Sequence, residues 1–461
     1  SALGIVRTSG SGTLEQLSKI FSRPKALLEA QGHTLVYGWI VDTGNRIDEV
    51  LIAVYRAPRS FTGEEMAEII CHGGPAVVTA VFELLLRSGF RQAEGGEFTF
   101  RGFINGKTDL TRAEAVREII DAKTDTGREH AVGRLAGNLH AELTRIKGLI
   151  IQALAAAEVE IEYPEEDHAD AGVFDTTAVE EVCTLLEELA AGWEAQKLYQ
   201  EGAKVVLCGR TNAGKSSLFN MLLKEERAIV SDIHGTTRDW LESWASFNGI
   251  PVRLFDTAGL RETSDTIEAA GVERSQGLAS EADLILYVVD SAEGLNGEDK
   301  DFIAGRGNLL LVGNKADRLQ AERLQMEQAQ TESSLLEGSI PSQALLVSAK
   351  AGSGIPALVD HAAALLASRA ASGHGSRSRS STGLSSAELR STELGTARQR
   401  RIVEEALASL RHAVASAKAG YPLDAIAQDL EDAVTALGEI TGEVTSDDIL
   451  DAVFSGFCVG K

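Results

Sequence analysis

The chain has 461 residues, a net charge of −24 and 44% hydrophobic residues. At roughly 150 residues per domain, this length predicts about three domains. The acidic balance argues against a protein that coats nucleic acid through an overall basic surface. The four cysteines form no C-x-x-C pair, so neither a zinc site nor a disulfide framework is expected. No apolar run approaches the roughly 20 residues that span a bilayer and no signal peptide precedes the first motif, so we expect a cytoplasmic protein without a membrane partner.

Residues 1–107 mix short β-type runs, LIAVYRAP and EFTFRGF, with glycine-rich turns such as CHGGP, which predicts a small α/β domain. The opening SALGIVRTSG resembles a strand entered midway, so we expect a few residues to precede it. From about residue 108 to 200 the pattern becomes helical. Apolar residues recur there at steps of three and four, which predicts one face of a long helix: Leu135, Leu139, Leu143, Ile146 and Ile150.

Near residue 201 the pattern changes again. Short apolar runs alternate with helical stretches, and this order predicts a mainly parallel sheet covered on both faces. The runs are KVVLCG, PVRLFDTAG, DLILYVVD, NLLLVGNK and ALLVSAK. Residues 371–395 are rich in serine, glycine and arginine, so we expect a linker without a core of its own.

Helical periodicity resumes after this linker. Two apolar faces are expected, formed by Val403, Leu407, Leu410, Val414 and Ala417, and by Leu423, Ile426, Leu430, Val434 and Leu437. Each helical flank alone needs a partner for its apolar face. The economical arrangement is one helical domain interrupted by an inserted α/β domain, and the alternative is two separate small bundles. The predicted fold class is therefore multidomain, α/β plus all-α.

The strongest motif is GRTNAGKS at residues 209–216, which matches G-x-x-x-x-G-K-[ST] between an expected strand and an expected helix. Its glycines let successive backbone N–H groups face phosphates, and the following helix adds its positive end. Lys215 is expected to reach the β- and γ-phosphates, and the Ser216 hydroxyl to bind Mg²⁺. The other nucleotide contacts expected here are Asn212, Ala213, Gly214 and Ser217.

Further segments in chain order distinguish GTP from ATP. DTAG ends one strand, NKAD ends another, SAK follows a third, and GTTRD lies where a switch loop belongs. Asp317 of NKAD can accept both the ring N–H and the exocyclic amine of guanine, a donor pair that adenine lacks. The ordered set predicts a GTPase. Its expected nucleotide contacts are Thr236, Thr237, Asp256, Gly259, Asn314, Lys315, Asp317, Ser348, Ala349 and Lys350.

The residue after DTAG is Leu260, whereas many regulatory GTPases place a water-orienting glutamine there. Leucine cannot orient water, so another side chain is expected to do so. The nearby carboxylates are Glu262, Asp265 and Glu268.

Longer segments resemble the MnmE (TrmE) family. They include GIVRTSG, SFTGEEMAEIICHGG and GEFTFRGFINGKTDLTRAEA near the start, and SDIHGTTRD and DTAGLRETSDTIEAAGVERS in the centre. The final segment, EITGEVTSDDILDAVFSGFCVGK, resembles the C-terminal signature of the family. The resemblance covers nearly the whole chain except the linker.

The resemblance implies a tetrahydrofolate-binding and dimerising domain at 1–107, a helical domain at 108–200 and 371–461, and an inserted P-loop GTPase domain at 201–370. It also implies a homodimer that works on tRNA with the FAD-containing partner MnmG (GidA) in a heterotetramer-type complex. Together they add an aminomethyl-type group, carboxymethylaminomethyl, to carbon 5 of the wobble uridine. The implied ligands are GTP, Mg²⁺, K⁺ and 5-formyl- or methylenetetrahydrofolate, with the methylene form as one-carbon donor.

By position, the resemblance makes Glu268 the water-orienting residue and Thr237 a second Mg²⁺ ligand. It places K⁺ at Asn212, Ser231, Ile233 and Thr236, and folate at Arg7, Glu68, Lys107 and Lys461. A cation beside the phosphates can stabilise transition-state charge as an arginine finger does. Without the family, Asn212 is a turn residue, Glu268 a solvated helix residue, and the folate set ordinary surface charges.

Cys458 has two interpretations, a nucleophile in the modification chemistry or a small residue that packs the tail, and Lys461 is the basic residue near it.

Two other functions fit parts of the chain. A regulatory GTPase switch in ribosome or RNA assembly fits the GTPase motifs, and a stand-alone folate-dependent transferase leaves them unexplained. The acidic net charge of the chain is compatible with work on tRNA if the FAD partner supplies much of the tRNA-binding surface.

Overall fold

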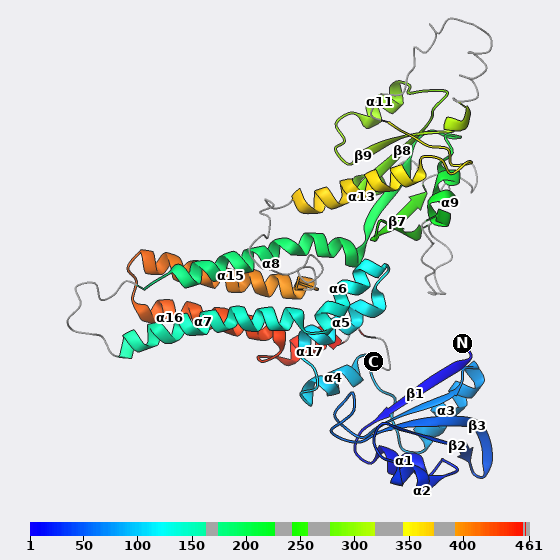
Figure 1. Ribbon diagram of the computed structural model, residues 1–461, viewed down its shortest axis with the longest axis vertical. Coiled ribbons are helices and arrows are strands. Elements are labelled where there is room, and N and C mark those ends of the chain that lie inside the picture. Colours follow the sequence, from blue (N-terminus) through cyan, green and yellow to red (C-terminus); the bar gives the residue numbers. More distant parts are fainter. Residues whose placement is uncertain are drawn as a thin grey trace, which may run out of the picture. The chain divides into compact units, whose positions relative to one another are not determined.

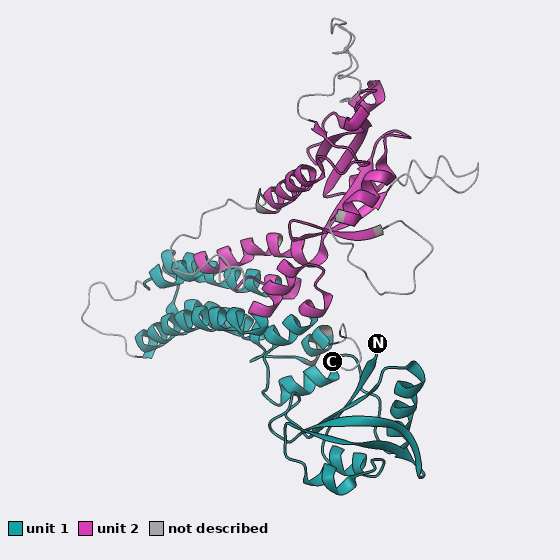
Figure 2. Ribbon diagram, turned by 45° about the vertical axis from the view of Figure 1, so that its right-hand side comes forward, with its two compact units in different colours: residues 1–117, 134–183, 401–461 teal, residues 118–133, 184–400 magenta. Residues whose placement is uncertain are grey.

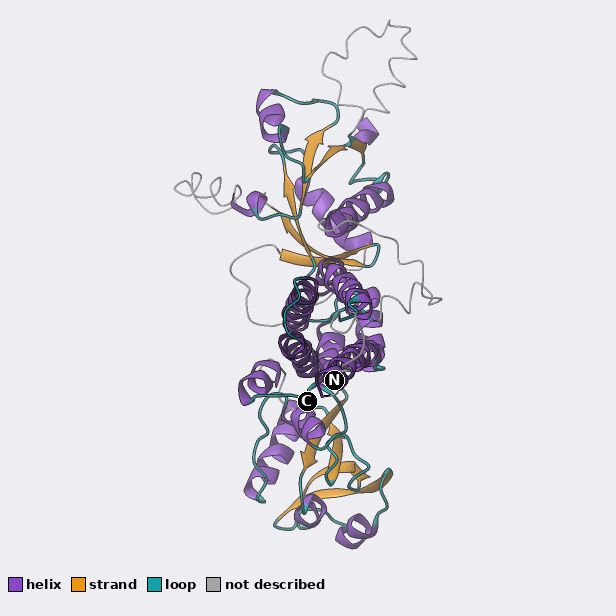
Figure 3. Ribbon diagram, turned by 90° about the vertical axis from the view of Figure 1, so that its left-hand side faces the viewer, coloured by secondary structure: helices purple, strands orange, loops and turns teal. Residues whose placement is uncertain are grey.

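The computed structural model describes residues 1–162, 174–225, 242–256, 277–318, 344–372, 392–454 and 457. These residues form two compact units. Unit 1 comprises residues 1–117, 134–183 and 401–461, and unit 2 comprises residues 118–133 and 184–400 (Figure 2). The strands gather in two separate sheets (Figure 3), and none of the described helices is long and apolar enough to cross a membrane.

The N-terminal part of unit 1 contains a four-stranded antiparallel sheet in the order β1-β4-β3-β2. Its strands are β1 (Leu3–Ser9), β2 (Thr34–Asp42), β3 (Asn45–Tyr55) and β4 (Met66–His72). Side chains alternate between the two faces, and one face carries the buried residues Val6, Val36, Ile52 and Ile69.

Three helices accompany this sheet (Figure 1): α1 (Thr13–Ser18), α2 (Pro24–Glu29) and α3 (Pro75–Arg87). Leu14, Leu27 and Leu84 from these helices join the buried face of the sheet in one core. The opposite face has exposed apolar residues at Leu3, Ile5, Leu35, Tyr37 and Leu51. This sheet therefore has a helix-covered face and an open apolar face.

The prediction that EFTFRGF is a β-type run is wrong. These residues form most of helix α4 (Glu97–Ile104), which begins after Gly96. Glu97 and Arg101 form an ion pair at i,i+4 with a distance of 2.9 Å, which stabilises a helix and not a strand. Phe100 and Phe103 pack against Phe454, so these residues of the expected β-type run meet a common partner from one face of a helix.

The helical part of unit 1 pairs segments from before and after residues 184–400, the longer stretch of unit 2. Its helices are α5 (Leu110–Asp121), α7 (Asn138–Glu162), α16 (Leu423–Thr441) and α17 (Asp447–Phe454). Helix α7 packs along α16, and an ion pair between Lys147 and Glu443 links the two segments. The predicted faces of α7 and α16 are buried at Leu143, Ile146 and Leu430.

Leu135 does not lie on the predicted face of α7. It is the last residue of α6 (Asp125–Leu135) and is exposed. Gly137 follows with a φ of 98°, a left-handed conformation that interrupts the helix before α7 begins. The chain passes between the units within α5, α6, α8 (Thr177–Glu201) and α15 (Ala397–Lys418).

Unit 2 contains a six-stranded sheet in the order β10-β9-β8-β5-β7-β6. Among the described strands of this sheet, β6 pairs antiparallel with β7 and the other pairs are parallel, so the prediction of a mainly parallel sheet is confirmed. The strands are β5 (Ala203–Cys208), β6 (Glu242–Phe247), β7 (Ile250–Asp256), β8 (Leu284–Asp290), β9 (Leu309–Asn314) and β10 (Leu345–Leu346).

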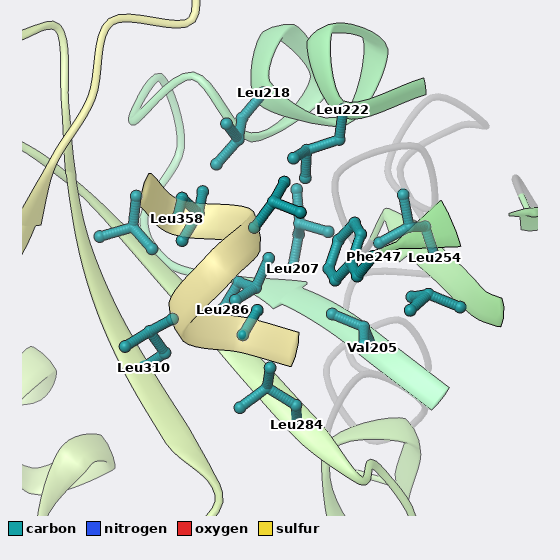
Figure 4. Packing of buried hydrophobic residues seen from close by; sticks show 14 of the residues in the cluster. Val205, Leu207, Leu218, Leu222, Phe247, Leu254, Leu284, Leu286, Leu310 and Leu358 are labelled. Atoms are coloured by element: carbon teal, nitrogen blue, oxygen red, sulfur yellow. The ribbon is translucent and has the colours of Figure 1, made fainter. Parts of the chain in front are cut away.

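Both faces of this sheet are buried. On one face, Leu218 and Leu222 of α9 (Lys215–Glu225) and Leu358 of α13 (Ile355–Ser372) point toward Leu207 and Leu286 of the strands (Figure 4). The alternate strand residues form a second core with Phe302 of α11 (Gly297–Ile303). Because helices cover both faces, the polar ends of the strands are the places where functional side chains can gather.

Candidate functional site

The P-loop follows β5 directly and leads into α9. Its backbone has left-handed or related positive φ values at Gly209 (130°), Asn212 (63°) and Gly214 (90°). A Cβ on Gly209 would lie 2.0 Å from the Val288 carbonyl oxygen, and one on Gly214 would lie 2.2 Å from Asn314 Nδ2. Glycine is therefore required at both ends of the loop, as expected for a backbone that curls tightly enough to surround phosphate oxygens.

Lys215 and Ser216, the described residues that are predicted to bind the phosphates and Mg²⁺, directly follow this loop. Lys215 is buried at the start of α9, and its Nζ donates to the carbonyl oxygens of Gly209 (2.9 Å) and Arg210 (2.8 Å). Ser216 follows in the first turn of α9, and Asp256 ends β7 opposite Leu207 of β5. A hydroxyl in the first turn of a helix and a carboxylate at the end of the neighbouring strand suit Mg²⁺, which is usually held by few protein oxygens together with nucleotide phosphates.

Asn314 connects the P-loop with the SAK segment. Its Nδ2 donates to the Ala213 carbonyl oxygen at 3.0 Å, and its Oδ1 accepts from the Ala349 backbone N–H at 3.0 Å. The structure thus brings together three segments that are separated by about one hundred and by thirty-five residues in sequence. The fully buried amide of Asn314 has partners on both sides, and such a polar group rigidifies the loops that it joins.

Asp317 lies next to the same SAK segment. Its Oδ1 accepts a hydrogen bond from Ser348 Oγ at 2.6 Å, and this bond lowers the pKa of the Asp317 carboxyl below its usual range. The Ala316 backbone N–H donates to the carbonyl oxygen of Val347, the residue after β10, at 3.0 Å, and this bond holds the NKAD turn beside the SAK segment. Asp317 is therefore presented as an ionised acceptor, the form that can accept two donors from guanine.

The sequence interpretation missed two acidic residues around these loops. Asp290 ends β8 and accepts from Lys315 Nζ at 2.7 Å. Asp299 is fully buried, accepts from Tyr287 Oη at 2.7 Å and lies 3.2 Å from Arg210 Nε in the P-loop. The run DLILYVVD held a signal for the first, because a carboxylate at the end of a buried strand lies at the edge where ligands bind; the second had no such signal.

The remaining GTPase predictions fall partly outside the described residues. Ala213, Ser217 and Lys350 lie within the P-loop, α9 and the SAK segment. The residues outside the described ranges are Ser231, Ile233, Thr236, Thr237, Gly259, Leu260, Glu262, Asp265 and Glu268. Among the described residues there is no group of three or more histidine, cysteine, aspartate or glutamate side chains that could hold a metal ion.

Two of the predicted folate residues are directly paired. Arg7 of β1 and Glu68 of β4 are register partners, and their side chains form an ion pair of 2.7 Å. Tyr55 Oη donates to the other Glu68 oxygen at 3.2 Å, and burial together with the Glu68 charge raises the pKa of Tyr55. The Arg7 guanidinium also lies over the Phe61 ring, 5.8 Å from its centroid. A carboxylate, a guanidinium and two aromatic rings suit a planar, hydrogen-bonding ligand such as a pterin.

Lys107 is exposed and belongs to the same region through the loop that contains Phe61. A Cβ on Gly63 of that loop would lie 3.4 Å from Lys107 Cγ. A second cluster beside the loop was not predicted: Glu64 accepts from Ser9 Oγ (2.8 Å) and from Arg101 (2.9 Å). These partners come from β1 and α4, so no short sequence motif reveals them.

Of the predicted C-terminal signature, the structure describes the residues up to 454 and residue 457. Phe457 is buried against Phe454, and a Cβ on Gly95 would lie 2.5 Å from its carbonyl oxygen. The chain is therefore held against the start of α4 at this point. Cys458 and Lys461 lie outside the described residues, and the other three cysteines are buried and not joined in disulfide bonds.

Two protein-family models match nearly the whole chain. The family model described as the N-terminus of the GTP-binding protein TrmE matches residues 1–107, and the MnmE helical domain model matches residues 110–458. Among solved structures, a variant of Aquifex aeolicus Era bound to GDP.AlF4- matches 34% of this chain and 55% of its own at 24% identity. Its TM-score of 0.25 is too low to support a conclusion about the site.

Two curated relatives match over the full length of this chain and over 96% of their own. The tRNA modification GTPase MnmE of Treponema denticola is 51% identical, and that of Treponema pallidum is 41% identical. The resemblance inferred from the motifs is thus confirmed along the whole chain. The chain belongs to the MnmE (TrmE) family of tRNA modification GTPases.

Proposed function

We propose that this chain hydrolyses GTP as one subunit of the complex that adds a carboxymethylaminomethyl group to carbon 5 of the wobble uridine of certain tRNAs. The observation that carries the proposal is the joined set of P-loop, NKAD and SAK segments around Asn314, on a chain that matches both family models. The partner in this proposal is the FAD-containing MnmG, and the working location is the cytoplasm.

Each nucleotide-site residue has a proposed role. Lys215 holds the β- and γ-phosphates, and Ser216, Asp256 and Thr237 surround Mg²⁺. Asp317 accepts from guanine, while Ser348, Ala349 and Lys350 support the base. Glu268 orients the attacking water in place of the missing glutamine, and a potassium ion bound by Asn212 and the loop 231–236 stabilises the charge that develops on the phosphates.

We further propose three domains: residues 1–107 for folate and dimerisation, residues 108–200 and 371–461 for the helical domain, and residues 201–370 for the GTPase domain. The paired Arg7 and Glu68 support the folate proposal, because a guanidinium and a carboxylate side by side match a ligand with both donors and acceptors. Lys107 and Lys461 would meet the glutamate tail. Tetrahydrofolate would supply the one-carbon unit, and Cys458 is the candidate nucleophile at the C-terminus.

Reconstitution tests this function. The purified chain, its FAD partner, unmodified tRNA, methylenetetrahydrofolate, GTP, Mg²⁺ and K⁺ are combined, and the wobble nucleoside is identified by mass spectrometry. Glu268→Ala should bind GTP with nearly unchanged affinity but turn it over slowly, since a water-orienting residue acts mainly in the transition state. Modification should fail with this variant. Full modification without GTP hydrolysis would contradict the proposal.

The homodimer has a specific candidate surface on the open face of the N-terminal sheet. Ile5 and Leu51 are both register partners of Ile70, and Tyr37 continues the same row from β2. Ile5 is 59% exposed and Tyr37 49% exposed. An exposed apolar row of this kind is typical of protein–protein contacts, and a second copy of the chain would cover it.

A paired substitution tests this surface. Ile5→Asp with Leu51→Asp should convert the dimer to a monomer in sedimentation equilibrium, because two buried carboxylates per protomer would face the partner without counter-charges. The control is Leu28→Asp, an exposed apolar position on α2 outside the strands of the sheet. It should remain dimeric. If the paired variant dimerises as strongly as the wild type, the dimer contact does not lie on this face of the sheet.

A further inference from the structure

Asp290 is a buried carboxylate at the nucleotide edge of the sheet to which no sequence motif assigns a role. It is the last residue of β8 and the register partner of Asn314 in β9. The residue is 4% exposed, and both of its oxygens are engaged. Oδ1 accepts from the Ala292 backbone N–H at 3.0 Å, and Oδ2 accepts from Lys315 Nζ at 2.7 Å. Arg318 adds a weaker charge at 3.9 Å.

These contacts keep a negative charge in a place where burial disfavours it. Burial alone raises the pKa of Asp290, but the hydrogen bonds from Lys315 and Ala292, with the charges of Lys315 and Arg318, lower it overall. The Asp290–Lys315 pair is thus an ion pair at neutral pH. A hydrophobic pair would serve the core at least as well, because desolvation offsets much of the attraction in a buried ion pair. The charged pair of Asp290 and Lys315 therefore suggests that Asp290 positions the Lys315 side chain.

Lys315 needs such an anchor. It has a φ of 63°, a left-handed conformation that is costly for a residue with a long side chain. Its Cε lies 4.0 Å from the point where a Cβ on Gly214 would stand, so the side chain runs beside the P-loop before it reaches Asp290. Lys315 directly follows Asn314, which donates to the Ala213 carbonyl oxygen of the P-loop. Two residues later comes Asp317, the proposed guanine acceptor, which accepts from Ser348 Oγ.

We propose that Asp290 is a positioning residue for guanine-nucleotide binding, which acts by holding the Lys315 side chain beside Gly214. The proposal rests on the proposed GTP site. Anchoring the ammonium group fixes the turn of residues 314–317 before the nucleotide arrives. Less binding free energy is then spent on ordering this loop when the nucleotide binds, so the affinity is higher. A second link works in the same direction, since the Ser291 backbone N–H donates to the Asn314 carbonyl oxygen at 2.9 Å.

A double-mutant cycle tests the proposal on the full-length chain. Asp290→Asn keeps the shape of the side chain and removes its charge, and Lys315→Met keeps most of the apolar length and removes the ammonium. The affinity for a fluorescent GDP is measured for both single variants and for the double variant. Asp290→Asn should weaken binding by about 10-fold in the wild-type background and by less than about 2-fold in the Lys315→Met background. Wild-type affinity, or equal losses in both backgrounds, would overturn the proposal.

Two further measurements separate positioning from base reading and from general destabilisation. Inosine diphosphate lacks the exocyclic amine that Asp317 is expected to accept, so the ratio of GDP to inosine diphosphate affinity reports base reading. Asp290→Asn should leave this ratio unchanged while both affinities fall. The control is Asp283→Asn at the opposite end of the β8 region, where the carboxylate accepts from the Lys204 backbone N–H at 2.7 Å. It should keep wild-type GDP affinity. A loss of GDP affinity as large as that of Asp290→Asn would show that both changes act by destabilising the sheet in general.

If Asp290→Asn does not fold, the same cycle is run with Asp290→Glu, whose carboxylate is displaced by one methylene group. A loss of GDP affinity that disappears in the Lys315→Met background supports positioning, whereas a loss that persists, or no loss, overturns it. Failure of the wild-type chain to bind GDP would reject the proposed GTP site itself. The wild-type titration and the cycle therefore distinguish the two claims.

Discussion

Asp317→Asn is expected to weaken GTP binding by about two orders of magnitude, because a charged hydrogen-bond pair with guanine is lost. Asp317 accepts from Ser348 Oγ at 2.6 Å, so the carboxylate is already oriented before it meets the base. The Ser348 hydrogen bond lowers its pKa, which keeps it ionised at neutral pH. Asparagine retains the shape but offers an amide donor where guanine also offers an amine donor, and the two repel.

The same change should create affinity for xanthine nucleotides. Xanthine has a carbonyl oxygen where guanine has its exocyclic amine, so the amide of Asn at position 317 can donate to it. Calorimetric titration of GDP and xanthosine diphosphate with both proteins measures this reversal. The matched control is Asp360→Asn, an acidic residue of α13 that pairs with Asn248 at 2.8 Å. Unchanged GDP affinity in Asp317→Asn would mean that residues 314–317 do not recognise the base.

Potassium should accelerate GTP hydrolysis by about one to three orders of magnitude over sodium, which reaches at most the lower end of the roughly 10³–10⁵-fold effect of an arginine finger. Asn212 is exposed in the P-loop with a φ of 63°, a conformation that asparagine tolerates better than most residues. Its side-chain oxygen is the proposed ligand, together with oxygens of the loop 231–236. The smaller sodium ion fits a cage of fixed oxygens less well, so the charge that develops between the β- and γ-phosphates is stabilised less.

Single-turnover hydrolysis in matched potassium and sodium buffers measures this difference. Asn212→Ala should remove most of the potassium effect and keep nucleotide affinity, since Lys215 and Ser216 remain in place. Asn220→Ala, on the exposed side of α9, is the control and should respond to potassium as the wild type does. Equal wild-type rates in both salts would remove the potassium site, although guanine specificity would stand.

The parts of the site that depend on consecutive residues could be predicted from the sequence. The P-loop is such a part, because a strand, a glycine-rich turn and a helix follow one another within residues 203–225. Asp290–Lys315 and Arg210–Asp299 could not be paired in advance. Each pair joins segments whose proximity depends on which strands are neighbours in the six-stranded sheet, and periodicity alone does not determine that order.

The N-terminal region shows the same limit in a different form. Arg7 and Glu68 were each singled out, but their direct ion pair follows from the register of β1 with β4. The error at residues 97–103 has a local cause. Four aromatic and β-branched residues in a short run favour a strand by propensity, whereas packing of Phe100 and Phe103 against Phe454 favours a helix. A contact between residues more than 350 positions apart thus overrides local preference.

The most direct measurement of the central claim is the nucleoside content of tRNA from a strain that lacks this protein. Purified tRNA is digested, and the wobble nucleosides are identified by mass spectrometry, with a strain that carries the wild-type gene and one that carries Asp317→Asn for comparison. We predict that uridines with an aminomethyl-type group at carbon 5 disappear in the deletion strain, return with the wild-type gene and do not return to wild-type levels with Asp317→Asn. Normal amounts of these nucleosides in the deletion strain would contradict the account.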